Sequence, residues 1–403
     1  MTFTAELDSA DPHAYLHRMR ERDPVERRVD ASGRAFWYLT RYADVRRALQ
    51  APELGRQLDR LPPELAETHR RWEHDTLPMF RRNVFNLDPP DHTRLRRLLA
   101  PVFSARSMAA LSRRVDQCVG ELVGAMTGEC DLIKALALPL PILIMAELIG
   151  FPAEDRGRLR AWSDAMLSED VPAARRAGME FLGHVNRRIE DRRADPGDDL
   201  LSQLTGSTEL SRAELVSSVF QMLFAGDETT VGLIGIAMLE LLRHPAQLAR
   251  LRADPGLLDS AIEEVLRFNG PVGHARPLYA LADIRFGGKV IPQGDVVVPL
   301  LLAANRDPEV FPDPDVFDIG RTPNRHLGLG HGAHFCLGAA LGRSQARAAL
   351  GALLARFDEI TLAVAPEAVE WVPGLLVRGL RGLPLRVSMG GALSMPGARA
   401  GAE

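Results

Sequence analysis

The chain lacks the features that mark several common classes of protein. Its cysteines are only Cys118, Cys130 and Cys336, which form neither a disulfide framework nor a Cys-x-x-Cys metal pair. Of 49 basic residues, only Lys134 and Lys289 are lysine, and the formal net charge is -4. Because there is no excess of positive charge, we expect neither nucleic acid nor an anionic membrane as a partner.

Long apolar runs and targeting signals are also missing. No stretch approaches ~18 apolar residues without a charge. The first residues, MTFTAELDSADPHAYL, lack the basic start and apolar run of a signal peptide. No Gly-x-Gly-x-x-Gly fingerprint follows a strand, so the chain shows no flavin-binding or nicotinamide-binding unit. We expect a cytoplasmic monomer that does not enter a membrane.

The patterns that are present are mostly helical. Helices are predicted at 12–21, 41–50, twice within 91–126, and at 137–149, 154–168, 172–193, 198–204, 211–243, 257–269 and 337–356. Strands are predicted at 35–40, 277–281, 283–286, 289–291 and 295–300, and irregular loops at 66–88 and 305–325. The predicted fold class is mainly α with a small β region. We expect one domain over 1–389 and a disordered tail over 390–403.

The long predicted helix at 211–243 contains an unexpected polar block. Ser211 and Glu214 give its start a capping-box pattern, and most of its length is apolar. At its middle, however, AGDETT (225–230) places two carboxylates and two threonines. Burying charge is costly, and apolar residues flank the block on all faces, so a solvated surface patch does not account for it.

The strongest motif is HLGLGHGAHFCLGAALGR, residues 326–343. Its glycines at 328, 330, 332 and 338 permit tight turns and close approach to a flat ligand. Cys336 lies at the start of a predicted helix, whose N–H groups favour the thiolate that a metal ligand requires. A lone cysteine is more often simply buried, but the glycine pattern favours a ligand here.

This motif resembles the haem-binding loop of the cytochrome P-450 family, Phe-Gly-x-Gly-x-His/Arg-x-Cys-x-Gly. Leu329 stands where the family has Phe, and the remaining motif positions are matched by Gly330, Gly332, His334, Cys336 and Gly338. The resemblance extends to about residue 388. It implies the cytochrome P-450 fold, with haem b between the long distal helix and the cysteine-loop helix, and with Cys336 as the ligand of the iron.

A second motif of the family is a Glu-x-x-Arg pair on one helix face. Glu264 and Arg267 match it, and in the family this pair locks a buried meander beneath the haem. Val316 occupies the place where the meander often carries an arginine. Arg321, His326 or no residue is therefore the third partner.

Residues that bind the haem propionates are implied in two segments. His92 and Arg96 lie at i and i+4 in DPPDHTRLRRLL (88–99) and match the family's propionate ligands, although a solvated helix face is the alternative. Leu278 stands where relatives have a propionate-binding arginine. Arg276, two residues earlier on the same face of an extended segment, or His274 is the candidate substitute.

In the family, the AGDETT block faces the haem. The resemblance implies that Ala225 and Gly226 lie against the porphyrin and that Thr229 presents its hydroxyl to dioxygen. Glu228 is expected to deliver protons as a general acid. Asp227 occupies a variable position; it either pairs with an arginine behind the helix or reaches water, and no function is assigned to it.

The implied activity is an O2-dependent monooxygenation that hydroxylates or epoxidises a mostly apolar secondary metabolite. Electrons would come from NAD(P)H through a ferredoxin and a ferredoxin reductase, and the candidate docking residues are His331, Arg343 and Arg347, with an ordinary charged surface as the alternative. The expected substrate-pocket residues are Gln221, Met222, Val272, Gly273, Leu375, Leu376 and Val377.

Other activities of the same haem remain open. Oxidative phenol coupling or ring closure would insert no oxygen. A non-catalytic haem protein, or a peroxide-driven or isomerising relative, is less favoured because Thr229 and Glu228 are both present.

Overall fold

The computed structural model describes residues 11–389 apart from 31, 73–77 and 168–169. The predicted tail, 390–403, lies outside the described residues. The helices are α1 (His13–Arg22), α2 (Tyr42–Ala48), α3 (Pro63–Trp72), α4 (Asp91–Leu99), α5 (Ala105–Gly124), α6 (Pro139–Ile149), α7 (Arg156–Leu167), α8 (Val171–Ala194), α9 (Leu200–Thr205), α10 (Arg212–Arg243), α11 (Pro245–Ala253), α12 (Leu258–Asn269), α13 (Leu301–Ala304) and α14 (Ala339–Arg356). The strands are β1 (Val25–Val29), β2 (Ala35–Leu39), β3 (Leu54–Gly55), β4 (Gly128–Asp131), β5 (Leu278–Ala280), β6 (Ile284–Phe286), β7 (Lys289–Ile291), β8 (Val296–Pro299), β9 (Glu359–Leu362) and β10 (Pro384–Ser388).

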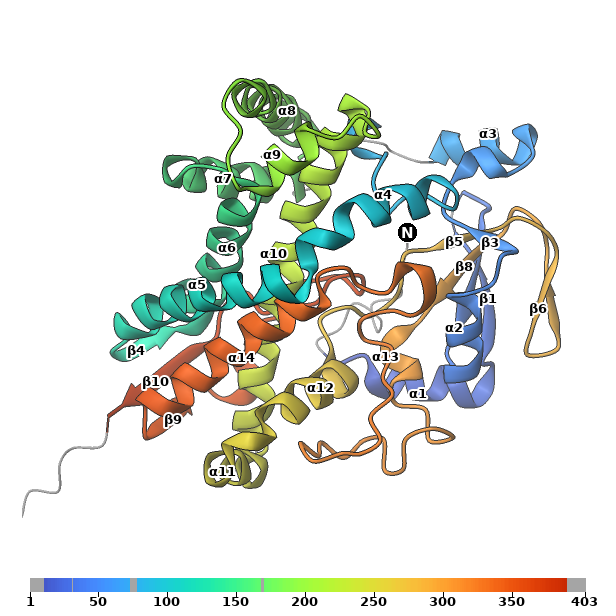
Figure 1. The fold of residues 1–403 in the computed structure, drawn as a ribbon. Coiled ribbons are helices and arrows are strands. Elements are labelled where there is room, and N and C mark those ends of the chain that lie inside the picture. Colours follow the sequence, from blue (N-terminus) through green and yellow to red (C-terminus); the bar gives the residue numbers. More distant parts are fainter. Residues whose placement is uncertain (1–10, 31, 73–77, 168–169, 390–403) are drawn as a thin grey trace, which may run out of the picture.

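Helix α10 is the axis of the molecule (Figure 1). Its start is fixed by the predicted capping box, because the Ser211 side chain accepts from the Glu214 backbone and the Glu214 side chain accepts from the Ser211 backbone. The helix is α-helical without interruption through AGDETT. Its length and composition would allow it to span a membrane, but 72% of its most apolar window is buried inside the molecule, as in the core helix of a globular protein.

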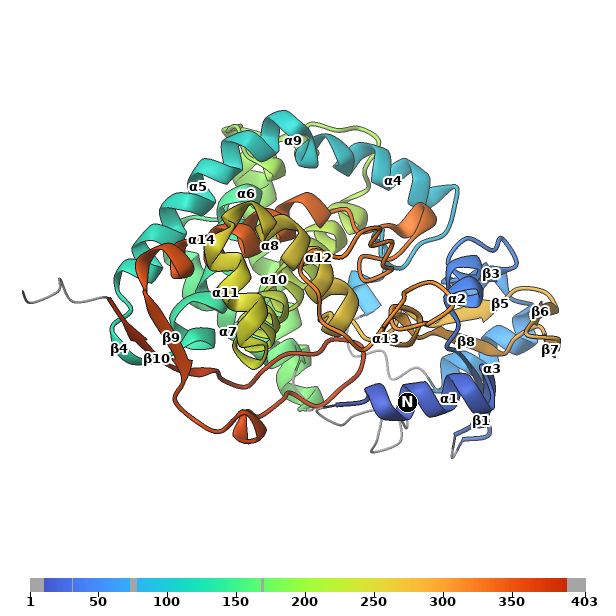
Figure 2. The ribbon, with the colours of Figure 1, turned by 90° about the horizontal axis from the view of Figure 1, so that it is seen from below.

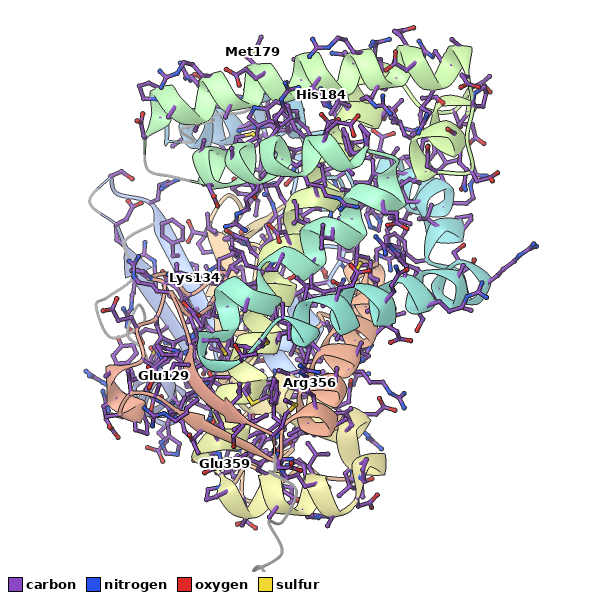
Figure 3. The ribbon with its side chains drawn as sticks, turned by 90° about the vertical axis from the view of Figure 1, so that its left-hand side faces the viewer. Glu129, Lys134, Met179, His184, Arg356 and Glu359 are labelled. Atoms are coloured by element: carbon purple, nitrogen blue, oxygen red, sulfur yellow. The ribbon has the colours of Figure 1, made fainter. Side chains whose placement is uncertain are left out.

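The other long helices surround this axis. Helix α10 packs against α6, α14 and α12, and α14 also packs against α5. Helices α7 and α8 pack together at one end of the molecule, where Figure 3 shows His184 on the inner side of α8 and Met179 on its outer side. His184 Nε2 lies 2.7 Å from Asp155 Oδ2, which ties α8 to the start of α7.

The β structure lies beside this helical body. A mixed sheet has the order β1-β2-β8-β5-β3, with β2 and β8 parallel and its other pairs antiparallel. Figure 2 shows this sheet and α1 on the opposite side of the molecule from α5 and α6. A second, antiparallel sheet has the order β4-β10-β9. The hairpin β6–β7 turns at Gly287 and Gly288, both with positive φ, as the predicted turn requires.

The predicted architecture, mainly α with a small β region, is confirmed, but some elements were mispredicted. The prediction of a loop over 66–88 was wrong at its start, because α3 covers Pro63–Trp72. Helix α11 and strands β1 and β4 were not predicted. Strand β8 ends at Pro299, and α13 follows it. Residues 73–77 of the predicted loop lie outside the described residues.

Candidate active site

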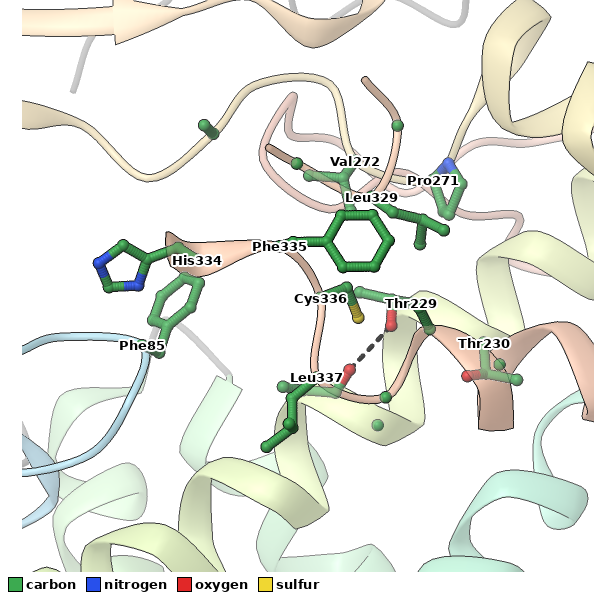
Figure 4. A pocket seen from close by; sticks show the side chains of 18 of the residues that line it. Phe85, Thr229, Thr230, Pro271, Val272, Leu329, His334, Phe335, Cys336 and Leu337 are labelled. Atoms are coloured by element: carbon green, nitrogen blue, oxygen red, sulfur yellow. Dashed lines mark hydrogen bonds between the residues drawn. The ribbon is translucent and has the colours of Figure 1, made fainter. Parts of the chain in front are cut away.

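A large cavity separates the middle of α10 from the segment that precedes and begins α14. It holds about 1530 Å³ of empty space, counting its opening to solvent. Cys336 lines one wall, and Ala225, Gly226 and Thr229 line the other (Figure 4). The cavity is therefore bounded by a thiol on one side and by the AGDETT block of α10 on the other.

The cysteine loop is shaped by its glycines. Gly330 and Gly332 have φ of +75° and +72°, a region that favours glycine. At Gly328 an added Cβ would lie 2.6 Å from the carbonyl oxygen of Leu266, so only glycine permits this approach to α12. The Cys336 N–H donates to the Leu329 carbonyl at 2.9 Å, which closes the turn. Leu329, Gly330, His334 and Gly338 all line the cavity, as their motif positions predict.

The Cys336 thiol lines the cavity. Burial raises the pKa of this thiol, while the Gly338 backbone N–H and the charges of Arg343 and Arg96 act in the opposite direction. A bound metal cation would reverse the effect of burial, because a coordinating thiol is deprotonated.

Beneath the loop, the Glu264–Arg267 pair is fully buried. Arg267 Nη2 and Nε donate to the two Glu264 carboxylate oxygens at 2.7 and 2.8 Å, and neither side chain is exposed. Arg267 Nη1 donates to the Asn305 carbonyl, and Arg321 Nε donates to Glu264 at 3.2 Å. Arg321 is thus the third partner that the sequence left open, whereas His326 contacts Glu263.

The opposite wall shows how Thr229 is held. Its hydroxyl donates to the Ala225 carbonyl one turn earlier at 2.8 Å, the bond drawn in Figure 4. At Gly226 an added Cβ would lie 3.1 Å from Met145 Sδ of α6. The missing side chain of Gly226 thus serves close packing of α10 on α6 as well as access to the cavity.

Basic side chains gather at one end of the cavity. Arg96, Arg276, His274 and His334 line it. His92 and Arg96 line an adjoining opening beside Gly332, and the His92 and His334 ring centroids are 4.0 Å apart. His92 is only 2% exposed, yet neither ring nitrogen has a hydrogen-bond partner among the described residues. Burial, with the charges of Arg96 and Arg56, lowers the pKa of His92.

Comparisons with known proteins agree with this geometry. The cytochrome P450 family model matches residues 159–368. The chain is 40% identical to the cytochrome P450 monooxygenase PikC of Streptomyces venezuelae, over 94% of this chain and 91% of PikC. It is 36% identical to the polyketide biosynthesis cytochrome P450 PksS of Bacillus subtilis, over 94% of this chain and 96% of PksS. The solved structure of myxobacterial CYP267B1 with myristic acid superposes with a TM-score of 0.88 at 41% identity, covering 94% of this chain and 97% of that one.

The chain belongs to the cytochrome P450 family. This P450 is a haem-thiolate monooxygenase with haem b as its cofactor, as the sequence motifs implied. The residues present fit that group, since a cysteine thiol faces the cavity from one wall and a cluster of buried bases, including the unpartnered His92, can receive two propionates. When bound, a thiolate-ligated haem supplies the electron-rich iron that favours O–O cleavage.

The two acidic residues of AGDETT, Asp227 and Glu228, have different surroundings in this P450. Asp227 is fully buried behind α10, and its Oδ2 lies 3.4 Å from Arg160 Nη1 of α7, so the pairing alternative is the one observed. Burial raises the pKa of Asp227 to about 7, against the charge of Arg160 and with the charges of Glu228 and Asp164.

Glu228 does not line the cavity. It is partly buried, burial raises its pKa, and none of the described residues forms a hydrogen bond or an ion pair with its carboxylate. The charges that act on its carboxylate are those of Arg160 and Asp164 on α7, and the general-acid role of Glu228 stays a prediction.

Some of the predicted substrate residues line the cavity and others do not. Gln221, Met222, Val272 and Leu376 line the cavity. Gly273, Leu375 and Val377 do not line it, and their contact with substrate stays a prediction. Gly273 N–H donates to the Leu375 carbonyl at 2.9 Å, and the Leu375 side chain packs in the core beside the large sheet. In an extended segment, alternate side chains face opposite sides, and only Leu376 faces the cavity.

Sequence reasoning missed one buried base of the cavity wall. Arg56, directly after β3, is 7% exposed and lines the cavity. No local motif marks it, because its place depends on the pairing of β3 with β5, more distant in the chain. Phe85 and Phe103 also line the cavity and were not singled out.

Proposed function

We propose that this P450 hydroxylates or epoxidises a mostly apolar natural product. The observation that carries the proposal is one cavity in which Cys336 and Thr229 stand on opposite walls between mainly apolar side chains. A thiolate ligand on one side and a hydroxyl on the other are what proton-assisted cleavage of dioxygen requires.

Thr229 and Glu228 would handle protons in this mechanism. The Thr229 hydroxyl hydrogen is held by the Ala225 carbonyl, so its oxygen lone pairs remain available to accept from a molecule in the cavity. Glu228 lies one residue away, its carboxylate has no ion-pair partner among the described residues, and burial raises its pKa, so it takes up a proton more readily than a solvated glutamate. Paired with Asp227, Arg160 is kept from forming an ion pair with Glu228.

The substrate would contact Gln221, Met222, Val272 and Leu376. Three of these four side chains are apolar, which suits a large hydrophobic molecule. Two similar proteins support that class: PksS is named for polyketide biosynthesis, and CYP267B1 was solved in complex with myristic acid.

Electron transfer would depend on a separate ferredoxin and ferredoxin reductase. Of the candidate docking residues, Arg343 is held by both oxygens of Glu263 and His331 accepts from Arg46. Arg347 is exposed, and Asp259, also exposed, is its ion-pair partner among the described residues, so it is the candidate most available to an acidic partner. A cytoplasmic, monomeric enzyme with one domain over residues 1–389 completes the proposal.

The reaction is tested with surrogate ferredoxin and reductase, a panel of macrolactones and long-chain fatty acids, and ¹⁸O2. Product carrying ¹⁸O supports oxygen insertion. Ring-closed or coupled product without label would replace it with oxidative coupling, and neither product nor oxygen consumption across the panel would favour a non-catalytic haem protein.

The two walls are tested separately. Cys336→Ser should abolish the spectrum of reduced, CO-bound, thiolate-ligated haem, whereas Cys130→Ser on β4, away from the cavity, should retain it. Thr229→Ala should keep haem but release hydrogen peroxide in place of product, and Thr229→Ser should restore coupling. Retention of the thiolate spectrum in Cys336→Ser, or full coupling in Thr229→Ala, would contradict the assigned roles.

A further inference from the structure

Arg56 is a buried arginine whose guanidinium forms no ion pair with any of the described residues. Its Nη1 donates to the Phe85 carbonyl at 2.6 Å, and its Nε is buried without a partner among the described residues. The guanidinium carbon lies 5.6 Å from the Phe85 ring centroid. A carbonyl and an aromatic face partly offset the burial of a cation, but neither neutralises it.

Among the described residues, the carboxylate that acts on Arg56 is that of Asp88, and it is already engaged. Asp88 accepts the Arg56 backbone N–H at 2.9 and 3.0 Å and the Gln57 backbone N–H at 3.1 Å, and Arg60 Nη1 lies 3.6 Å from it. Asp88 therefore fixes the chain at Arg56 rather than pairing with its side chain. Its own carbonyl accepts the N–H of His92, so one residue positions both Arg56 and the start of α4.

The groups that face Arg56 are themselves basic. Burial, with repulsion from Arg276 and against the attraction of Asp88, lowers the pKa of Arg56 to about 9. Arg56 in turn lowers the pKa of both His92 and His334. Figure 4 shows Phe85, whose ring lies near both Arg56 and Arg276, beside His334. A surplus of buried positive charge at one end of a cavity is stabilised when an anion occupies that end.

We infer that Arg56 binds a haem propionate, as a further guanidinium beside Arg96 and Arg276. The anion required is a carboxylate, because a planar guanidinium fork matches carboxylate geometry. A propionate is favoured over a substrate carboxylate since the basic neighbours of Arg56 are His92, His334 and Arg276, and none belongs to α10. The inference rests on haem as the cofactor and on the propionate roles proposed for His92 and Arg96.

The test measures haem release from the holoenzyme to excess apomyoglobin. Arg56→Gln should release haem roughly 10- to 100-fold faster, the effect expected for one charge-assisted hydrogen bond. The matched control is Arg60→Gln, because Arg60 also faces Asp88 but is 41% exposed and does not line the cavity. Its release rate should stay within about threefold of the parent, a change of less than about 0.7 kcal/mol.

A chemical control decides whether the propionate is the partner. The parent and Arg56→Gln are each reconstituted with haem dimethyl ester, which lacks the carboxylate charge. The difference between their haem release rates should then disappear. If Arg56→Gln fails to hold haem, Arg56→Lys is compared instead and should release haem at an intermediate rate. Unchanged release with natural haem, or an equal difference with the ester, would overturn the inference.

Two further measurements separate this inference from others. If Arg56→Gln keeps parental haem release but weakens the spectral shift caused by myristate and not that caused by 1-tetradecanol, Arg56 recognises a substrate carboxylate and the inference is wrong. The reduced, CO-bound spectrum of the parent reports Cys336 ligation independently. Failure of the thiolate assignment would thus be visible in the parent itself, whereas failure of the Arg56 inference leaves that spectrum intact.

Discussion

Two buried clusters of charge stand on either side of the cysteine loop, and they differ in how completely they are paired. In the Glu264–Arg267–Arg321 cluster each carboxylate oxygen and each guanidinium finds partners within the protein. At the basic end of the cavity, the His92 ring nitrogens and Arg56 Nε have none among the described residues. A completed network holds the fold, whereas an incomplete one is shaped for a molecule that the chain does not itself contain.

The largest expected effect is on the completed network. Glu264→Gln leaves Arg267 buried without its counter-charge, so we expect the free energy of unfolding to fall by about 3–5 kcal/mol. Chemical denaturation followed by circular dichroism measures this. A loss below ~1 kcal/mol would show that the pairing is not structural and would remove the contrast between the clusters.

Asp227 lies between the two clusters in how completely it is paired. Its Oδ2 forms an ion pair with Arg160, but its buried Oδ1 has no partner among the described residues. Burial raises its pKa to about 7 in the fold, from the 3.8 of a solvated aspartate. Between these values the folded state binds the extra proton, so stability is present at low pH and lost as the pH rises to about 7.

Asp227→Asn should remove this pH dependence and raise stability at pH ~8 by up to about 4 kcal/mol. Thermal unfolding from pH 5 to 8 measures it, with Asp164→Asn as the exposed control that shares Arg160. A parallel pH dependence in parent and Asp227→Asn would contradict the prediction, since Glu228 would then be the titrating group.

At the incomplete end, substitution should separate stability from cofactor binding. His92→Phe keeps the ring but removes nitrogens that bond nothing in the protein, so the haem-free chain should unfold within about 1 kcal/mol of the parent. Haem transfer to apomyoglobin should be roughly 10-fold faster or more. If unfolding and haem release worsened together by the same free energy, His92 would belong with the structural cluster.

The smallest effect is expected at the surface. Arg347 and Asp259 form a 2.9 Å pair in which both side chains are more than half exposed, at 62% and 65%. Arg347→Gln should change the free energy of unfolding by less than about 0.5 kcal/mol. Its effect should instead be seen in the salt dependence of electron transfer from ferredoxin, and no change in either property would assign the pair to ordinary surface.

Local signals predicted much of this molecule. The capping box predicted that α10 starts after Ser211, as observed. The glycines of the cysteine loop predicted tight turns, and Gly330 and Gly332 do adopt the positive φ angles that favour glycine. The Glu264–Arg267 pairing could be proposed because residues three apart share a helix face. In each case the signal and the structure lie within a few residues of one another.

What could not be predicted depends on distant parts of the chain. Strand β4 exists because Gly128–Asp131 pairs with β10 near the other end of the sequence. Arg56 reaches the cavity because β3 adds to β5. Leu375 and Leu376 are identical side chains in adjacent positions, so the sequence does not show which of them faces the core. The backbone hydrogen bond between Gly273 and Leu375 fixes the segment so that Leu375 does.

Glu263, next to the structural pair, has a further consequence for the cysteine loop. It accepts from His326 Nε2 at 3.0 Å and from Arg343 Nε at 2.6 Å, residues that stand at the two ends of the motif 326–343. Burial opposes its ionisation, but these hydrogen bonds prevail and lower its pKa to about 2, so it stays charged at any physiological pH. One carboxylate thereby closes the motif into a ring. The entropic cost of closing that ring is met during folding, so the Cys336 sulfur is preorganised before a cofactor binds.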